Sequence, residues 1–216
     1  NLQIMELSIK QTLTLDYLED KTTKEVIYGG GAGGGKSILG VYWVLKMCFK
    51  YPGTRWLIGR AKLKTLTETT LLSLFQVMQI QGIPSSVYNY NQQKNIITFF
   101  NGSQIFLKDL FFYPSDQNFD ELGSLEITGA FIDECNQIVK KAWDIVRSRI
   151  RYKLDENGLI PKMMGSCNPA KNWVYSEFYL PAENNELPEQ KKFVQSLVTD
   201  NPFISKHYIE NLQSLD

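Results

Sequence analysis

Short apolar runs alternate along this chain with longer stretches in which apolar residues recur every three or four positions. Runs of about four to eight apolar or β-branched residues are typical of buried strands, and the wider spacing is typical of helices that pack on one side. Strands that alternate with helices predict an α/β fold, in which a mostly parallel central sheet is sandwiched by helices. The predicted strands span residues 25–28, 55–59, 95–100, 104–107, 127–132, 162–166 and 193–198. The predicted helices span residues 7–20, 36–50, 65–81, 138–151 and 204–215.

Turn residues mark the boundaries between these elements. Tyr51-Pro52-Gly53-Thr54 predicts a turn after the second helix. Asn101-Gly102 lies between two β-rich runs and predicts a β-hairpin inserted into the fold. Residues 113–124 are polar and predicted to form a loop, and Asp200-Asn201-Pro202 ends the last strand. We therefore expect a core domain over residues 1–198, followed at 199–216 by the start of a small helical lid or linker.

A glycine-rich segment lies between the first predicted strand and the second predicted helix. Glycines let backbone N–H groups approach phosphate oxygens, the lysine places a positive charge on the β- and γ-phosphates, and the serine hydroxyl binds Mg²⁺. A flexible glycine linker is the alternative, but a linker would lie between polar segments, whereas both flanks here are apolar. The segment therefore predicts a P-loop that binds a nucleotide. The match to G-x-x-x-x-G-K-[ST] is formed by Gly30, Gly31, Ala32, Gly33, Gly34, Gly35, Lys36 and Ser37.

An acidic pair, Asp133-Glu134, follows the apolar run Ala130-Phe131-Ile132. In an open parallel sheet, ligands bind at the carboxyl ends of the strands, so this pair and the P-loop should face the same crevice. Asp133 is then placed to hold Mg²⁺, and Glu134 to orient and polarise the attacking water. An ordinary helix N-cap is the alternative for such a pair, and the P-loop upstream favours catalysis.

Two later segments carry further candidate chemistry. Ser166-Cys167-Asn168-Pro169 follows the next strand, where Asn168 would lie beside the γ-phosphate; an Asn-Pro turn is the alternative. The run 146–151 alternates arginine with other residues. It is either a solvated helix face or a source of positive charge for a neighbouring subunit's γ-phosphate or for DNA. The candidate arginines are Arg147, Arg149 and Arg151, with Arg60 at a strand end as their rival.

Composition narrows the class of protein without naming a partner. The 216 residues are 43% hydrophobic with a formal net charge of zero, so bulk charge does not indicate nucleic-acid binding. Three scattered cysteines have no zinc spacing and suggest a reducing compartment, and the single His207 excludes a His-cluster metal site. No apolar run approaches the roughly 20 residues of a membrane span, and no signal peptide opens the chain.

The motifs together resemble the ATPase domain of phage terminase large subunits, the motors that pump DNA into procapsids. The resemblance covers most of the chain. Many ATPases share the P-loop and the acidic pair, so the order and spacing of the later motifs distinguish this family from the others. It implies Mg²⁺-dependent ATP hydrolysis, with Lys36, Glu134, Asn168 and Arg149 as catalytic residues. It also implies that Gln11, next to Lys10, reads the adenine base. The matching motifs are the P-loop, Gly59-Arg60, Phe131 to Glu134, Ser148 to Arg151, Cys167-Asn168-Pro169, Trp173 and Phe178, Thr199 to Phe203, and Tyr208-Ile209.

This chain departs from the family pattern in two ways. Many relatives carry an arginine within the P-loop where this chain has Ala32. If that arginine helps catalysis, the role falls here to one of the four candidate arginines. The acidic metal cluster of the terminase nuclease domain is also missing, so we expect the ATPase portion only. The expected partners are double-stranded DNA, further copies in a ring, and the portal and small terminase subunit, all in the host bacterial cytoplasm. A helicase or recombination ATPase, or an assembly module with little turnover, remains the alternative.

Overall fold

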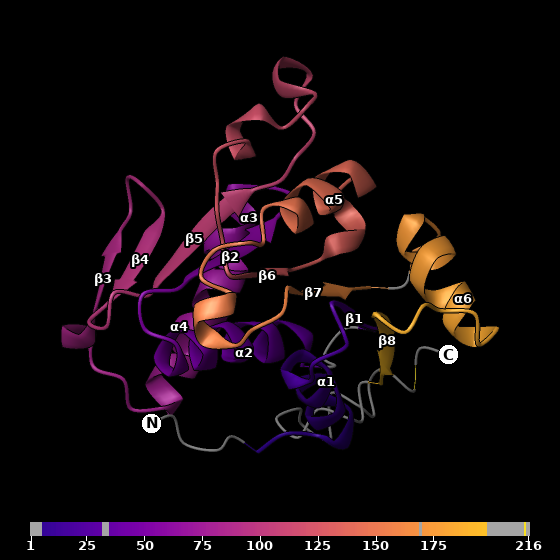
Figure 1. The fold of residues 1–216 in the computed structure, drawn as a ribbon, viewed down its shortest axis with the longest axis horizontal. Helices are drawn as coiled ribbons and strands as arrows, with labels where there is room; N and C mark the ends of the chain where they lie inside the picture. The colour runs from indigo at the N-terminus through magenta and orange to yellow at the C-terminus, as the bar shows by residue number, and fades with distance from the viewer. Residues whose placement is uncertain (1–5, 32–34, 169, 198–213, 215–216) are drawn as a thin grey trace.

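The computed structural model describes residues 6–31, 35–168, 170–197 and 214 (Figure 1). Its centre is an eight-stranded sheet in the order β3-β4-β5-β2-β6-β7-β1-β8. All pairings from β5 to β8 are parallel, whereas β3 and β4 run antiparallel at one edge. The strands are β1 (Glu25–Gly30), β2 (Arg55–Arg60), β3 (Tyr88–Asn91), β4 (Ile96–Phe99), β5 (Gln104–Asp109), β6 (Gly129–Ile132), β7 (Lys162–Cys167) and β8 (Lys191–Ser196).

Helices cover both faces of the sheet, with α1, α2 and α4 on one side and α5 on the other (Figure 1). The α-helices are α1 (Ile9–Glu19), α2 (Lys36–Lys50), α3 (Leu63–Thr65), α4 (Leu71–Ile80), α5 (Lys140–Ser148) and α6 (Leu180–Glu183). Two π-helical turns, η1 (Leu66–Thr70) and η7 (Tyr175–Tyr179), precede α4 and α6. Short 3₁₀ turns are η2 (Ser85–Val87), η3 (Pro114–Asp116), η4 (Asp120–Leu122), η5 (Cys135–Gln137) and η6 (Asp155–Asn157).

Alternation along the central strands builds a hydrophobic core on each face. Val26 and Tyr28 of β1 pack with α1 and α2, whereas Ile27 points to the opposite core with α5. Helix α2 lies close to the sheet because Gly40 faces the Phe131 ring, and a Cβ there would meet a ring carbon at 2.2 Å. The two cores therefore fix the beginning of α2 above the ends of β1 and β6.

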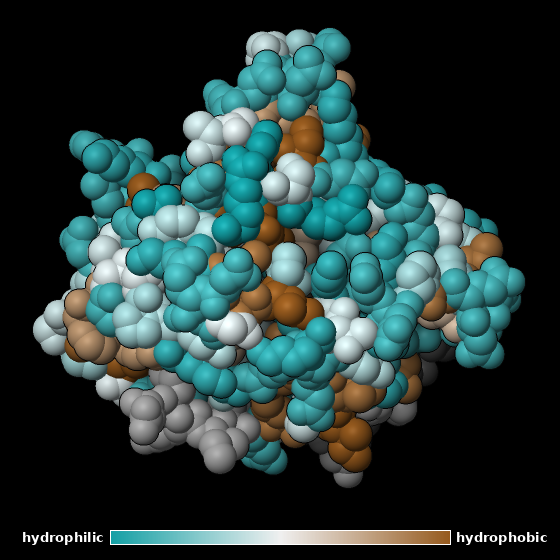
Figure 2. All heavy atoms as spheres, viewed as in Figure 1, coloured by the Kyte–Doolittle hydropathy of each residue, from teal (hydrophilic) through white to brown (hydrophobic). Residues whose placement is uncertain are grey.

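The outer surface is mainly polar. Figure 2 shows hydrophilic side chains over most of the visible face, with small hydrophobic patches between them. Within the part of the chain that the structure describes, no helix is long and apolar enough to cross a membrane.

The predicted α/β class and the mostly parallel sheet are confirmed. The hairpin predicted around Asn101-Gly102 is the antiparallel pair β4–β5, and Gly102 turns with a φ of 84°. The sequence reading missed β3, which pairs with β4 at the sheet edge, and the helical segment that includes η7 and α6. The helix predicted at 204–215 lies outside the described residues apart from position 214.

Several predicted elements have different limits in the structure, and two of these differences bear on the candidate site. The helix predicted at 138–151 is α5, which ends at Ser148 because Ile150 forms a parallel bridge with Ile127. The strand predicted at 127–132 begins regular pairing only at Gly129. Arg149 and Arg151 therefore lie beyond the helix rather than on it.

Candidate active site

The carboxyl ends of four neighbouring strands bring the predicted site residues to one edge of the sheet. β1 ends at Gly30, β2 at Arg60, β6 just before Asp133, and β7 just before Asn168. The parallel register of β2, β6, β7 and β1 places these ends side by side. The sheet order thus assembles a site from residues more than a hundred positions apart.

Lys36 lies in the first turn of α2, above the end of β1. Its side chain is buried, and its Nζ donates to the backbone oxygens of Gly30 at 3.0 Å and Gly31 at 2.9 Å. A third bond, 3.0 Å long, goes to Oδ1 of Asn168. The helix begins at Gly35, which has a left-handed φ of 74° and no side-chain cap, so its first N–H groups are free of capping side chains. Ala32, Gly33 and Gly34 lie outside the described residues.

Gly30 is required where β1 leaves the sheet. A Cβ at this position would lie 2.1 Å from the backbone oxygen of Ser196 in β8, which no side chain can tolerate. The first P-loop glycine is therefore needed for close packing of β1 on β8 as well as for the loop itself.

Asp133 is the most heavily hydrogen-bonded carboxylate of the site. Ser37 Oγ lies 2.9 Å from both of its oxygens. Ser166 donates to Oδ1 at 2.6 Å, and Thr70 donates to Oδ2 at 2.6 Å. Arg60 Nη1 lies 3.4 Å from Oδ2. The carboxylate is only 1% exposed, so these donors replace the water that would otherwise solvate its charge.

Glu134 and Asn168 form a second contact between β6 and β7. Asn168 Nδ2 donates to Oε2 of Glu134 at 2.9 Å, while its Oδ1 accepts from Lys36. Glu134 has a left-handed φ of 50°, and its backbone N–H donates to Ser166 Oγ at 3.1 Å. The Asn168 side-chain amide therefore links Lys36 of the P-loop to the Glu134 carboxylate.

Burial shifts the pKa of both charged groups that Asn168 connects. Burial raises the pKa of the Glu134 carboxyl, the adjacent Asp133 raises it further, and Lys36 and Arg60 oppose the shift. Burial also lowers the pKa of the Lys36 ammonium, against the attraction of Glu134, Cys167 and Asp133. Both groups thus lie in an environment that penalises charge.

Gln11 is completely buried beside the beginning of α2. It forms a capping box with Ser8, in which its Oε1 accepts from the Ser8 N–H at 2.9 Å. Its Nε2 donates to the backbone oxygen of Gly35 at 3.2 Å. Gln11 therefore connects α1 to the P-loop, and its predicted contact with adenine stays a prediction.

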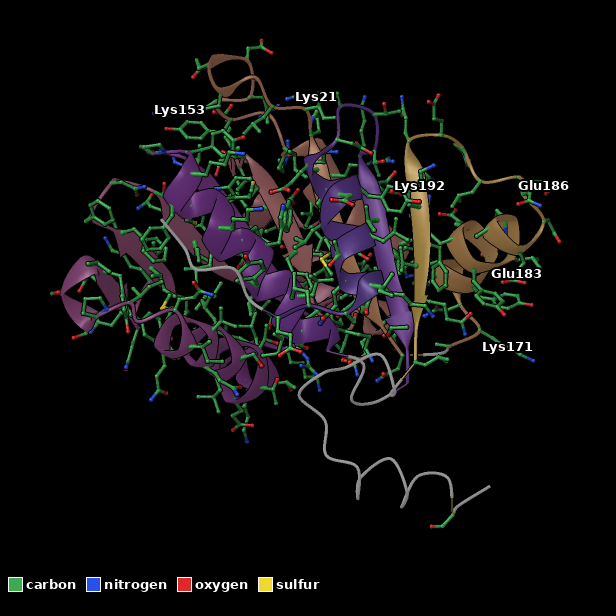
Figure 3. The ribbon with its side chains drawn as sticks, turned by 90° about the horizontal axis from the view of Figure 1, so that it is seen from below. Lys21, Lys153, Lys171, Glu183, Glu186 and Lys192 are labelled. Atoms are coloured by element: carbon green, nitrogen blue, oxygen red, sulfur yellow. The ribbon has the colours of Figure 1, made fainter. Side chains whose placement is uncertain are left out.

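The candidate arginines divide between opposite edges of the sheet. Arg60 lies at the site, whereas Arg147 pairs with Glu25 at the start of β1, at 3.3 Å. The backbone oxygen of Arg149 accepts from Ile127, just before β6 begins. In Figure 3, Lys192 marks the side of the sheet where the parallel strands begin, and Lys171 marks the opposite side, where they end. Arg149 does not reach the site of its own chain, so its predicted role requires a neighbouring copy.

The sequence reading gave no role to two residues that hold Asp133. Ser166 occurs within a segment that was singled out for Asn168. Thr70 lies among several threonines, but it falls on the buried stripe of the helix with Leu66 and Leu74. Its place on a buried helical stripe indicates that its hydroxyl needs a partner, but the sequence does not show which one.

Comparisons with known proteins agree with this arrangement. A family model for the phage terminase large subunit matches residues 21–216. No curated protein sequence matches the chain. The large terminase of the thermophilic bacteriophage D6E is similar in structure, with a TM-score of 0.76 and 17% identity over 98% of this chain and 51% of that one.

Two further solved structures share the fold. The large terminase of bacteriophage HK97 has a TM-score of 0.69 and 10% identity, over 99% of this chain and 47% of that one. The ATPase domain of the large terminase from Thermus phage P74-26 has a TM-score of 0.59 and 13% identity, over 89% and 80%. The D6E protein has also been solved in complex with ADP and with ATP-γ-S. This chain spans about half the length of the D6E protein. With the family match over most of its length, the chain belongs to the phage terminase large subunit family.

Proposed function

We propose that this site hydrolyses ATP with Mg²⁺ and that hydrolysis drives double-stranded viral DNA into a procapsid. The observation that carries the proposal is the pair of contacts at the sheet edge: Ser37 with Asp133, and Lys36 with Glu134 through Asn168. These contacts support one crevice in which Lys36 would bind phosphate, Ser37 and Asp133 would hold the metal, and Glu134 would act as the base.

Lys36 and the beginning of α2 bind the phosphates. The ammonium exchanges its bond to Asn168 for γ-phosphate oxygens, because a charge-assisted contact with phosphate is stronger than one with a neutral amide. The N–H groups at the start of α2, which the Gly35 cap leaves without a side-chain partner, add a favourable helix end for the negative charge.

Ser37 and Asp133 fit a magnesium site. Mg²⁺ prefers oxygen ligands and is usually held by one or two protein groups together with the substrate's phosphates, which matches this hydroxyl and carboxylate. Bound Mg²⁺ offsets the negative charge of the β- and γ-phosphates. Thr70 and Ser166 keep the carboxylate in place during binding and release.

Glu134 acts as the base that orients the attacking water. Its raised pKa keeps it closer to the pH of the cell than an ordinary glutamate, which suits a general base. Asn168 holds this carboxylate while it also contacts Lys36, so phosphates that attract Lys36 also alter the position of Glu134. The amide thereby couples occupation of the P-loop to placement of the base.

The position of Arg60 suits it to supply the charge that the P-loop lacks at Ala32. Its guanidinium lies 3.4 Å from Asp133 and donates to Thr69 at 2.8 Å, so it is already at the metal side of the crevice. Arg149 would act on the site of a neighbouring copy in a ring.

The wider function rests on the family. Terminase motors imply DNA, the portal and the small terminase subunit as partners, and the host bacterial cytoplasm as the place of action. A formal net charge of zero fits a domain that contacts DNA only as part of a ring. The family match favours packaging over a helicase or recombination role.

DNA-stimulated ATPase activity tests the proposal. Turnover is measured with and without double-stranded DNA and procapsids, for the full chain and for Lys36→Ala. We expect DNA or procapsids to raise turnover, and Lys36→Ala to lose most ATP affinity by calorimetry. Unchanged ATP binding in Lys36→Ala would contradict the nucleotide site, and activity indifferent to DNA and procapsids would contradict the motor.

A further inference from the structure

Two thiols flank the residues that the mechanism uses. Cys135 directly follows Glu134, and Cys167 directly precedes Asn168. Both are free thiols that pack in the same hydrophobic core, and the Cys135 side chain lowers the pKa of the Cys167 thiol. Neither sulfur has a part in the proposed hydrolysis, so the mechanism does not explain why both lie beside it.

The packing of β6 against β7 brings the two sulfurs together. The strands are parallel, with Ile132 opposite Gly165. A Cβ at Gly165 would lie 2.8 Å from the Cys135 sulfur, so this sulfur packs directly on the β7 backbone, two residues before Cys167. Residues 165 and 167 lie on the same face of β7, so Cys167 points into the core that holds the Cys135 sulfur, as a disulfide between them requires.

A cavity gives a small oxidant access to one of the thiols. Cys167 and Asn168 line a cavity of about 410 Å³, together with Gly30, Tyr175 and Phe193. Lys171, labelled in Figure 3, also lines it. This volume accommodates a molecule as small as a peroxide many times over. Cys48, by contrast, is fully buried within α2 and does not line this cavity.

We propose that Cys135 and Cys167 are a modification site, which a peroxide converts to a reversible disulfide that stops ATP turnover. The sulfur of Cys167 attacks one peroxide oxygen, and the O–O bond breaks. Water is released, and Cys167 becomes a sulfenic acid. The sulfur of Cys135 then attacks that sulfur, an S–S bond forms, and the sulfenic oxygen leaves as a second water. Two thiols are oxidised as one peroxide is reduced to two waters.

The consequence for turnover rests on the proposed function. Asn168 already contacts Glu134 at 2.9 Å, and the disulfide joins the residues next to each of them. The cross-link would hold Glu134 against Asn168, so its carboxylate could not turn toward the attacking water. The chain would then respond to oxidation at the step of hydrolysis rather than by unfolding.

The experiment treats the full chain with hydrogen peroxide and follows mass and ATPase activity together. We expect the intact mass to fall by two hydrogens, peptide mapping to show Cys135 joined to Cys167, and turnover to fall about tenfold or more. Dithiothreitol should restore both the mass and the activity. Because the wild-type chain carries this test, it does not depend on the folding of any variant.

Single substitutions locate the effect. Cys135→Ala and Cys167→Ala should each abolish the peroxide-induced, reversible loss of activity, whereas Cys48→Ala should respond like the wild type. Absence of the cross-link, or a cross-link that leaves turnover unchanged, would overturn the inference. A reduced protein that hydrolyses no ATP would instead contradict the proposed function, and the mass would still show whether the disulfide forms.

Discussion

Replacing Thr70 with valine removes one hydroxyl from the site and leaves its shape nearly unchanged. Thr70 is the last residue of the π-helical turn η1, is 1% exposed, and donates to Asp133 at 2.6 Å. The π-helical turn rotates the chain so that a threonine on the buried stripe faces the carboxylate, and such turns often occur at functional sites. Valine would keep the threonine methyl and put a second methyl in place of the hydroxyl, which would leave Asp133 with one donor fewer.

The size of the effect follows from the remaining contacts of the carboxylate. A hydrogen bond to a charged group contributes about 1.5–3 kcal/mol. Oδ2 keeps Ser37 at 2.9 Å and Arg60 at 3.4 Å, so we expect the lower end of that range. A loss of about 1.5 kcal/mol corresponds to roughly a tenfold fall in turnover if the same interaction holds Asp133 in the transition state.

Steady-state ATPase assays and urea unfolding test this prediction. Thr70→Val should lose activity in that proportion, and Thr70→Ser, which keeps the hydroxyl, should retain most of it. Thr67→Val is the matched control, because the Thr67 hydroxyl donates to the Lys64 backbone oxygen at 2.9 Å and, among the described residues, has no bond to Asp133. Normal turnover in Thr70→Val, or equal damage in the serine variant, would refute the positioning role.

Three further predictions concern the arginines, the acid response of Asp20 and the recognition of the adenine ring by Gln11. Arg60→Ala should lower turnover by roughly 10²-fold while ATP still binds. If Arg149 acts instead on a neighbouring copy, Arg149→Ala should regain activity on mixing with Glu134→Gln. Specific activity that does not change with protein concentration, together with no rescue on mixing, would exclude this role of Arg149. Burial opposes ionisation of Asp20, but Lys162 at 2.8 Å and the Thr23 hydroxyl and N–H hold its pKa far below the usual value of 3.8. The stabilisation by ionised Asp20 is therefore full above pH 3.8 and is lost as pH falls toward the lowered pKa. Asp20→Asn should cost about 1 kcal/mol of unfolding free energy at neutral pH, after allowance for solvent screening. The difference in unfolding free energy between the two proteins should shrink in strong acid. Gln11→Ala should weaken the preference for ATP over GTP in calorimetry, and an unchanged preference would confine Gln11 to the capping box.

The regular part of the fold was predictable because burial on both faces leaves a clear pattern. Val26-Ile27-Tyr28 and Ala130-Phe131-Ile132 are continuous apolar runs, as parallel strands with helices on both sides require. β3 was missed because Tyr88 to Asn91 alternates tyrosine with asparagine and is half-exposed at the sheet edge. Its pairing depends on the neighbouring β4 rather than on its own composition.

The site was predictable where a motif fixes the chemistry and not where tertiary contacts decide it. The P-loop and Asp133-Glu134 follow from residue type and strand order, and the structure brings them together. No local pattern shows that Thr70 points to Asp133, since that depends on a π-helical turn. The end of α5 likewise depends on the bridge between Ile127 and Ile150, which places Arg149 at the edge of the sheet away from the site.

The most direct test of the account is ATP binding and hydrolysis by Glu134→Gln. Glutamine keeps the size of the side chain and a partner for Asn168 but cannot accept a proton from water. We expect ATP to bind by calorimetry with near wild-type affinity, while turnover falls by roughly 10²-fold or more. Turnover within a few fold of the wild type, or equal losses of affinity and rate, would contradict the assignment of Glu134 as the base of an ATPase.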